Sequence, residues 1–472
     1  MEITILKYLT LLVGFYMAWN IGANDVANAM GTSVGSRALT IKRAVIIAAF
    51  LEFSGAFFAG SHVSETIQSG IVDPNIFQAD PMIFALGMIG ALFATGLWLQ
   101  IASFKGLPVS TTHAIVGAVL GFGAVVGGLH AIYWMEIVQI VLSWVVSPVL
   151  SGIISYILFS MLQKQIFYSF NPLKKARRLA PFLVFFCFFV ITLSVLFDGL
   201  KNLHLDLSFP LALFYASLVG LFFSFVSRIL IRTLPVKDFE SRGYESPHQV
   251  IAIRKAEKHL QRLKLSSKGE TNEKASSLLK EIKALKREVQ GKVHYDDKGS
   301  LLAPVEKIFV YLQIISASLV AFAHGANDVA NAIGPVAAVI NVLNTNVIAH
   351  TSIIPYWLLI LGGIGIVIGL ATWGWRVIET VGKRITELTP TRGFCAEFGA
   401  AITILIATKM GLPISTTHAL VGAVLGIGFA RGLKALNLRT LRDIALSWVI
   451  TIPACAVMSI TIFYILRAFL IK

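Results

Sequence analysis

Charged side chains are scarce in this chain of 472 residues, because Asp, Glu, Lys and Arg together make up only 14% of it, whereas 56% of the residues are hydrophobic. The mean hydropathy of +0.76 exceeds what a soluble domain needs. A bilayer crossing takes about 20 mostly apolar residues in a helix. The sequence therefore predicts an all-α polytopic membrane protein with about twelve transmembrane helices, at 4–22, 44–62, 82–103, 110–129, 137–161, 181–198, 209–231, 306–323, 355–374, 395–409, 414–430 and 444–468.

Cysteine is almost absent. The three thiols, Cys187, Cys395 and Cys455, are scattered through apolar segments, a pattern that fits neither a disulfide framework nor a zinc site. We expect them to be packing residues. No early stretch joins a basic region to a small-residue cleavage site, so we expect the first apolar stretch to be retained as a span.

The Gly-x-Gly-Asp pattern of intramembrane proteases is also missing. Two aspartates in apolar stretches, Asp25 and Asp328, could in principle act as an acid/base pair. An intramembrane aspartyl enzyme is therefore a distant alternative. The expected protein is not an enzyme and uses no cofactor.

Two sequence phrases occur twice. GANDVANA at 22–29 recurs unchanged at 325–332, and GLPVSTTH at 106–113 recurs as GLPISTTH at 411–418. The spacing between the phrases is nearly the same in both copies, which indicates that one ancestral unit was duplicated within the chain.

Charge is concentrated in one segment. Residues 232–300 hold 16 Lys or Arg and 10 Asp or Glu, and part of this segment has the apolar spacing of an amphipathic helix. The segment is expected to be a soluble or membrane-surface loop, with a regulatory or partner-binding role as the alternative. Because 26 of the chain's 65 charged residues lie in this segment, the net charge of +15 does not indicate nucleic-acid binding.

Basic residues near the predicted span ends set the orientation, since cytoplasmic loops carry the Lys and Arg excess. They place both termini outside and the central loop in the cytoplasm. The second copy then enters the membrane upside down, and inverted repeats with a site at their interface are a transporter architecture. The expected units are a five-span repeat at 1–165, two connecting spans at 166–231, a charged cytoplasmic loop with an amphipathic helix at 232–303, and a second five-span repeat at 304–472.

The GLPxSTTH phrases predict re-entrant or broken half-helices. Gly and Pro interrupt an apolar stretch, and Pro and Ser or Thr are favoured where a helix restarts. The unpaired N–H groups and the positive end of the helix dipole attract an anion, and hydroxyls lie beside them. The alternative is a Pro-kinked span whose hydroxyls bond back to the helix. The candidate anion ligands are Ser110, Thr111, Thr112, Ser415, Thr416 and Thr417.

The GANDVANA phrases place Asp25 and Asp328 in apolar spans, where a carboxylate usually faces a site or a water-filled path. Small neighbours permit close backbone approach or a break in the helix, and tight helix packing around a satisfied Asn-Asp cap is the alternative. A carboxylate beside a bound dianion repels it unless a cation or a proton intervenes, so the anion site implies a coupling ion. Amide oxygens suit a small hard cation such as Na⁺, and the phrases supply Asn24, Asn28, Asn327 and Asn331.

These paired phrases resemble the signatures of the inorganic phosphate transporter family, over both halves of the membrane region. The resemblance implies twelve spans in two inverted repeats, with phosphate held between the two STTH half-helix starts. It implies symport with Na⁺ or H⁺ and a homodimer in the cell membrane. It further implies that Asn24, Asp25, Asn327 and Asp328 bind the coupling Na⁺ and take part in phosphate binding.

Four more ionisable residues are candidates. Glu52 and Glu397 match the family's pattern and could be cation ligands or proton acceptors, with a neutral glutamic acid bonded to a neighbouring helix as the alternative. His113 and His418 could relay protons, although a hydrogen-bonded structural histidine is the commoner case.

Hydrogen phosphate carries a proton that needs an acceptor, whereas sulfate only accepts hydrogen bonds. An ionised Asp25 or Asp328 supplies that acceptor and favours phosphate. Sulfate or a related oxyanion stays the close alternative, because a cation-shielded carboxylate tolerates it.

Overall fold

The computed structural model describes residues 2–169, 171–196, 207–233, 247–292, 302–348, 354–378, 388–431 and 438–470. These residues form helices and no β-strand, which confirms an all-α fold. Short 3-10 and π turns connect some of the helices. The α-helices are α1 (Glu2–Gly35), α2 (Ile41–Ala59), α3 (Ser61–Ser69), α4 (Pro81–Phe104), α5 (Thr111–Phe122), α6 (Trp134–Leu162), α7 (Pro172–Ser194), α8 (Phe209–Thr233), α9 (Pro247–Ser266), α10 (Glu270–Lys292), α11 (Ala303–Thr345), α12 (Tyr356–Thr372), α14 (Pro390–Lys409), α15 (Thr416–Arg431) and α16 (Leu438–Leu470).

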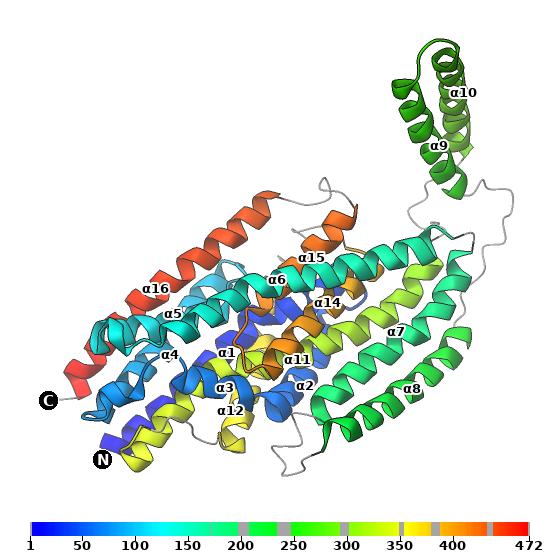
Figure 1. Cartoon of the computed structure of the whole chain (residues 1–472). Helices are drawn as coiled ribbons and strands as arrows, with labels where there is room; N and C mark the ends of the chain where they lie inside the picture. Colours follow the sequence, from blue (N-terminus) through cyan, green and yellow to red (C-terminus); the bar gives the residue numbers. More distant parts are fainter. Residues whose placement is uncertain are drawn as a thin grey trace.

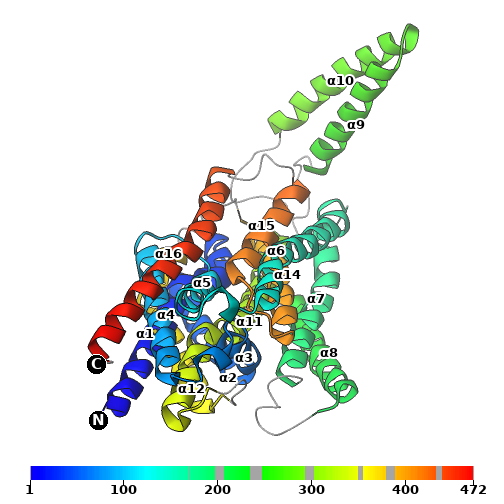
Figure 2. The ribbon, with the colours of Figure 1, turned by 60° about the vertical axis from the view of Figure 1, so that its left-hand side comes forward.

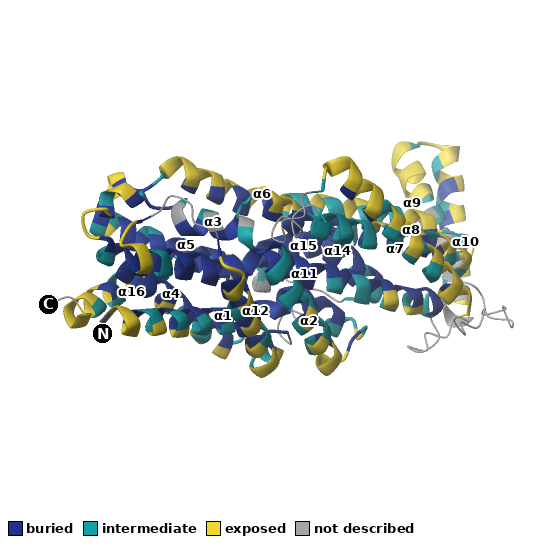
Figure 3. Cartoon of the chain, turned by 90° about the horizontal axis from the view of Figure 1, so that it is seen from below, coloured by how far each residue is buried: buried dark blue, intermediate teal, exposed yellow. Residues whose placement is uncertain are grey.

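Eight helices in the described ranges are long and apolar enough to cross a membrane, and α5 and α12 are shorter apolar helices. Buried residues run along the centre of the molecule through α1 and α11, and exposed residues lie outside (Figure 3). Many outer residues are apolar, such as Val145 and Val149 on α6 and Phe222 and Phe225 on α8, as contact with lipid requires. The protein is therefore a multi-pass membrane protein, and the total of twelve spans stays a prediction.

The two termini lie at one end of the molecule, and the α9–α10 hairpin lies at the other (Figure 1). α1 and α11 run antiparallel and pack against each other. This is the arrangement that inverted repeats produce, although the inversion and the unit boundaries at 1–165, 166–231, 232–303 and 304–472 stay predictions. Residues 234–246 and 293–301 of the predicted loop lie outside the described residues.

Helices from the two halves of the chain are interleaved. α12 packs on α1, while α2 packs on α11; α16 packs on α5, while α6 packs on α15. Each half-helix thus has a long helix of the other half as a main neighbour.

Two predicted span ends are wrong. The spans predicted at 4–22 and 306–323 continue as α1, with 34 residues, and α11, with 43 residues. Both helices run unbroken through the GANDVANA phrases. The small residues there serve close packing instead of a break: a Cβ added at Gly22 would lie 1.9 Å from the carbonyl oxygen of Ile366, and one at Gly325 would lie 2.0 Å from that of Glu52.

The chain breaks at the GLPxSTTH phrases, as predicted. Gly106 and Gly411 have φ angles of 64° and 68°, in the left-handed region that glycine adopts without steric cost. α5 then starts at Thr111 and α15 at Thr416.

Candidate functional site

The starts of α5 and α15 lie against each other. The hydroxyl of Thr112 donates a 2.8 Å hydrogen bond to the carbonyl oxygen of Ile414, and the hydroxyl of Thr417 donates one of 3.3 Å to that of Val109. Both threonines are buried. The two predicted anion-binding ends therefore form one buried region.

Serine caps each half-helix. The hydroxyl oxygen of Ser110 accepts a hydrogen bond from the N–H of His113, and that of Ser415 accepts one from the N–H of His418, both at 3.2 Å. An N-cap serine satisfies one of the first N–H groups and leaves others of that turn oriented beyond the helix end.

Each GANDVANA phrase contacts the half-helix of the other half of the chain. Asn28 on α1 donates a 2.8 Å hydrogen bond to the hydroxyl of Thr417. Asn331 on α11 lies 3.3 Å from the hydroxyls of both Thr111 and Thr112. The duplicated phrases, far apart in sequence, thus meet at a single site.

Asn24 and Asn327 fix the chain breaks. The Asn24 amide donates to the carbonyl of Leu107 at 3.1 Å and accepts from the N–H of Val109 at 3.2 Å. The Asn327 amide donates to the carbonyl of Leu412 at 3.3 Å. These side chains hold the loops ahead of α5 and α15 against α1 and α11.

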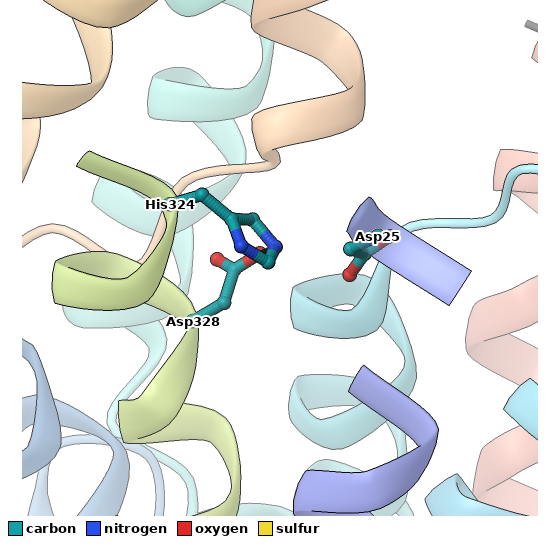
Figure 4. A group of neighbouring side chains, drawn as sticks. All are labelled: Asp25, His324 and Asp328. Carbon is teal, nitrogen blue, oxygen red and sulfur yellow. Dashed lines mark ion pairs between the residues drawn. The ribbon is translucent and has the colours of Figure 1, made fainter. Parts of the chain in front are cut away.

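The two aspartates are fully buried and lie near a histidine that the sequence analysis missed. Figure 4 shows Asp25 on α1 opposite His324 and Asp328 on α11. A ligand atom of each of the three residues lies within 4.8 Å of those of the others. Nε2 of His324 is 2.9 Å from Oδ2 of Asp328, and Nδ1 is 3.3 Å from Oε1 of Glu52. Asp328 also accepts a 2.9 Å hydrogen bond from Thr416.

This histidine connects only one aspartate to a glutamate. Gly22 packs against the backbone of Ile366, and its copy Gly325 packs against the backbone of Glu52. Because the two glycines are equivalent in the repeated phrases, Ile366 is the counterpart of Glu52 in the other half. Ile21, directly before the first GANDVANA, corresponds to His324. The duplication therefore concealed His324, although its spacing of one helical turn before Asp328 could have revealed it.

Buried oxygens at the site have unused acceptor capacity. Among the described side chains, five oxygens of the two phrases are buried without a hydrogen-bond donor: Asp25 Oδ2, Asn28 Oδ1, Asn327 Oδ1, Asp328 Oδ1 and Asn331 Oδ1. Buried polar atoms are normally paired. A group made of carboxylate and amide oxygens is suited to a hard cation, so the residues present fit the cation that the sequence implies.

Glu397 on α14 belongs to a separate group. It accepts hydrogen bonds of 2.5 and 2.6 Å from Thr32 and Ser33 on α1, and of 2.5 and 3.2 Å from Ser316 and Gln313 on α11. Its contacts on α1 and α11 lie two or more turns from the aspartates. The structure thus brings Glu52 to the aspartates and leaves Glu397 apart.

His113 and His418 pair with each other, 4.6 Å apart between ring centroids. Nδ1 of His418 lies 3.1 Å from the carbonyl oxygen of Trp144, and that of His113 lies 3.5 Å from the carbonyl oxygen of Trp448. The Trp144 carbonyl lacks its helical donor, because Pro148 has no N–H. These contacts favour a structural role, and the proton relay stays a prediction.

Comparison with known proteins agrees with the architecture and the motifs. A sequence profile described as "Phosphate transporter family" matches residues 21–459. The chain is 44% identical to the chloroplastic inorganic phosphate transporter 2-1 of Arabidopsis thaliana, over 97% of this chain and 71% of that protein. It is 45% identical to a putative phosphate permease of Chlamydia trachomatis, over 96% and 97% of the two chains.

A solved structure titled "The sodium-dependent phosphate transporter" superposes with a TM-score of 0.77 at 38% identity and covers 98% of this chain and 99% of its own. The predicted resemblance is confirmed, and the family is one of transporters, not of enzymes. From its motifs, its fold and these relatives, the chain belongs to the phosphate transporter family.

Proposed function

We propose that this protein imports inorganic phosphate by symport with Na⁺, with H⁺ as the alternative coupling ion. The observation that carries the proposal is the meeting of two capped half-helix starts with two buried aspartates. Membership of the family, and the name of the sodium-dependent structural relative, support the substrate and the ion.

In this proposal phosphate binds between the starts of α5 and α15. Helix N-termini attract anions through free N–H groups and the helix dipole. The side chains assigned to phosphate are Asp25, Ser110, Thr111, Thr112, Asp328, Ser415, Thr416 and Thr417.

Coupling cations bind at the two Asn-Asp phrases. Asp25 and Asp328 would repel a phosphate dianion in a buried site unless cations compensate their charge. The unpaired oxygens of Asn28, Asn327 and Asn331 add neutral ligands, while Asn24 uses its amide oxygen on Val109. Glu52 acts on the cation site indirectly, through His324. Glu397 provides a second, separate site for a cation or a proton.

Transport then requires the halves to move relative to each other. Cations entering from outside complete the pocket, phosphate docks, and one repeat rocks against the other to open the opposite side. Both termini lie outside the cell and the central loop lies in the cytoplasm. The protein works as a homodimer in the cell membrane, and nucleic acid is not among its partners.

The test is radiolabelled phosphate uptake into liposomes that contain the purified protein, with a Na⁺ gradient and a pH gradient imposed separately. Uptake driven by Na⁺ alone supports the proposal, and uptake driven only by the proton gradient selects the alternative ion. If sulfate is carried instead of phosphate, the substrate assignment is wrong while the anion site stands.

A further inference from the structure

The α9–α10 hairpin stands clear of the membrane helices (Figures 1 and 2). Its two helices pack antiparallel along a narrow seam, in which Ile253, Ala275 and Leu279 are buried. Lys286 and Glu257 form an ion pair of 2.7 Å across the helices. The seam fixes how each helix is rotated, and therefore which residues face away from it.

One side of the hairpin is basic. Lys280, Lys283 and Arg287 recur three and four residues apart on α10, so they form a stripe on one flank of the seam. Lys258 on α9 is rotated from the seam in the same sense, and Arg262, one turn later, lies at the outer edge of that side, almost opposite the seam. In an antiparallel pair, rotations from the seam in the same sense bring residues of both helices to the same side. All five side chains are exposed.

The carboxylates are placed unevenly. By the same periodicity Glu270, Glu281 and Glu288 lie on the opposite side of α10, and only Glu273, near the turn, falls on the basic side among the described glutamates. Residues 247–292 hold 12 Lys or Arg against five Glu, a net charge of +7. The positive field of the hairpin is thus directed to one side.

An exposed leucine accompanies this basic side. Leu265, near the end of α9, is 88% exposed and lies two turns from Lys258 on the same flank. Basic residues together with an exposed large apolar side chain are typical of helices that lie on anionic bilayers, where the apolar group enters the headgroup region.

We propose that this basic side, formed by Lys258, Arg262, Lys280, Lys283 and Arg287 with Leu265, binds the anionic lipid headgroups of the adjacent leaflet. The hairpin lies in the chain between α8 and α11, both of which are long and apolar enough to cross a membrane. It therefore begins and ends next to a bilayer surface, and the cytoplasmic leaflet of such a bilayer is anionic. Each Lys or Arg near an anionic membrane contributes about a fivefold change in partitioning. This inference is independent of phosphate transport.

The test uses the full-length protein in vesicles, with an environment-sensitive fluorophore on Gln261→Cys, an exposed position on the basic side. The native residues Cys187, Cys395 and Cys455 are buried, which favours labelling at the new site. We expect blue-shifted emission in vesicles that contain phosphatidylglycerol, little shift in pure phosphatidylcholine, and loss of the shift at high salt.

The deciding variant is Lys280→Glu/Lys283→Glu, which should abolish the shift. The matched control, Lys268→Glu/Lys274→Glu, changes the same amount of charge at the turn and on the opposite flank and should keep most of it. Equal emission in the two lipids, equal loss in both variants, or displacement by inorganic phosphate at constant ionic strength would each overturn the proposal. The last outcome would assign the basic side to the free anion.

Discussion

At the scale of single residues, the two aspartates most need a bound partner, because each is fully buried and has an oxygen without a hydrogen-bond donor. We expect Asp25→Asn to weaken Na⁺ and phosphate binding together, since it removes the charge of a proposed ligand without changing side-chain size. Charged hydrogen-bonding groups contribute about 1.5–3 kcal/mol, which is about tenfold or more in affinity. Uptake in liposomes and isothermal titration with each ion measure the two effects.

The control for this prediction is Asp443→Asn, which removes an exposed carboxylate that, among the described residues, pairs with its neighbour Arg442. It should leave uptake unchanged. Intact Na⁺ and phosphate affinities in Asp25→Asn would contradict the cation assignment.

His324 and Glu52 offer a second test, because Ile21 and Ile366 occupy the corresponding positions in the other half. We expect His324→Ile alone to destabilise the protein, because the buried carboxyl groups of Glu52 and Asp328 then lose the ring that they face. Removing one partner of a buried ionisable pair costs about 3–5 kcal/mol. The double variant His324→Ile/Glu52→Ile, which copies the other half, should recover much of that loss. Thermal unfolding in detergent measures both, and a double variant less stable than the single one would show that the pair does not act as a unit.

The residues of the site were predictable to different degrees. Asp25 and Asp328 could be predicted because a carboxylate in an apolar span is costly and stands out in a duplicated phrase. His324 could not be found by comparing the copies, since the duplicate has Ile21 at that position. The separation of Glu397 from Glu52 depends on how α2 and α14 pack, which residue type alone does not reveal.

At the scale of helices, two glycines set how closely neighbouring helices approach. A Cβ at Gly325 would lie 2.0 Å from the Glu52 carbonyl oxygen. Gly325→Ala should therefore push α2 away from α11, lower stability by about 1–3 kcal/mol, and reduce uptake. Gly90→Ala is the control, because the nearest atoms to its added Cβ are 3.3 Å away. Equal effects of the two substitutions on melting temperature and uptake would contradict the close-approach argument.

The serine caps of α5 and α15 give a test of the half-helix starts. Ser415→Ala removes the acceptor for the His418 N–H, and losing an N-cap costs about 1 kcal/mol. We expect a higher KM for phosphate together with this loss of stability. Thr40→Ala removes the cap of α2 and should lower stability while leaving the KM unchanged. An unchanged KM in Ser415→Ala would show that the cap of α15 does not affect phosphate binding.

Helix starts were easier to predict than helix ends. Gly, Pro and Ser in GLPxSTTH mark a chain break by local geometry, and α5 and α15 begin where expected. From sequence alone, the small residues in GANDVANA permit a break in the helix, yet α1 and α11 continue through them. They do so because packing against Ile366 and Glu52 requires small side chains and stabilises the helix.

At the scale of the whole molecule, the two halves are interleaved, so the candidate site is built from helices that also hold the halves together. α5 packs on α16 and α15 on α6, while Asn28 and Asn331 each contact the half-helix of the opposite half. A ligand bound between α5 and α15 therefore contacts both halves at once. Its binding energy should appear as stability of the entire membrane domain.

We therefore expect phosphate to stabilise the protein only when Na⁺ is also present. Phosphate alone meets two buried carboxylates, whereas phosphate with Na⁺ meets a site whose charge is compensated. A ligand at 100 times its Kd adds about 2.7 kcal/mol, a measurable rise in Tm. Unfolding in detergent with phosphate should thus give a higher Tm in NaCl than in KCl, and Asp25→Asn should remove the difference. If phosphate raised the Tm equally in both salts, the carboxylates would have to be neutralised by protons, and H⁺ would replace Na⁺ as the coupling ion.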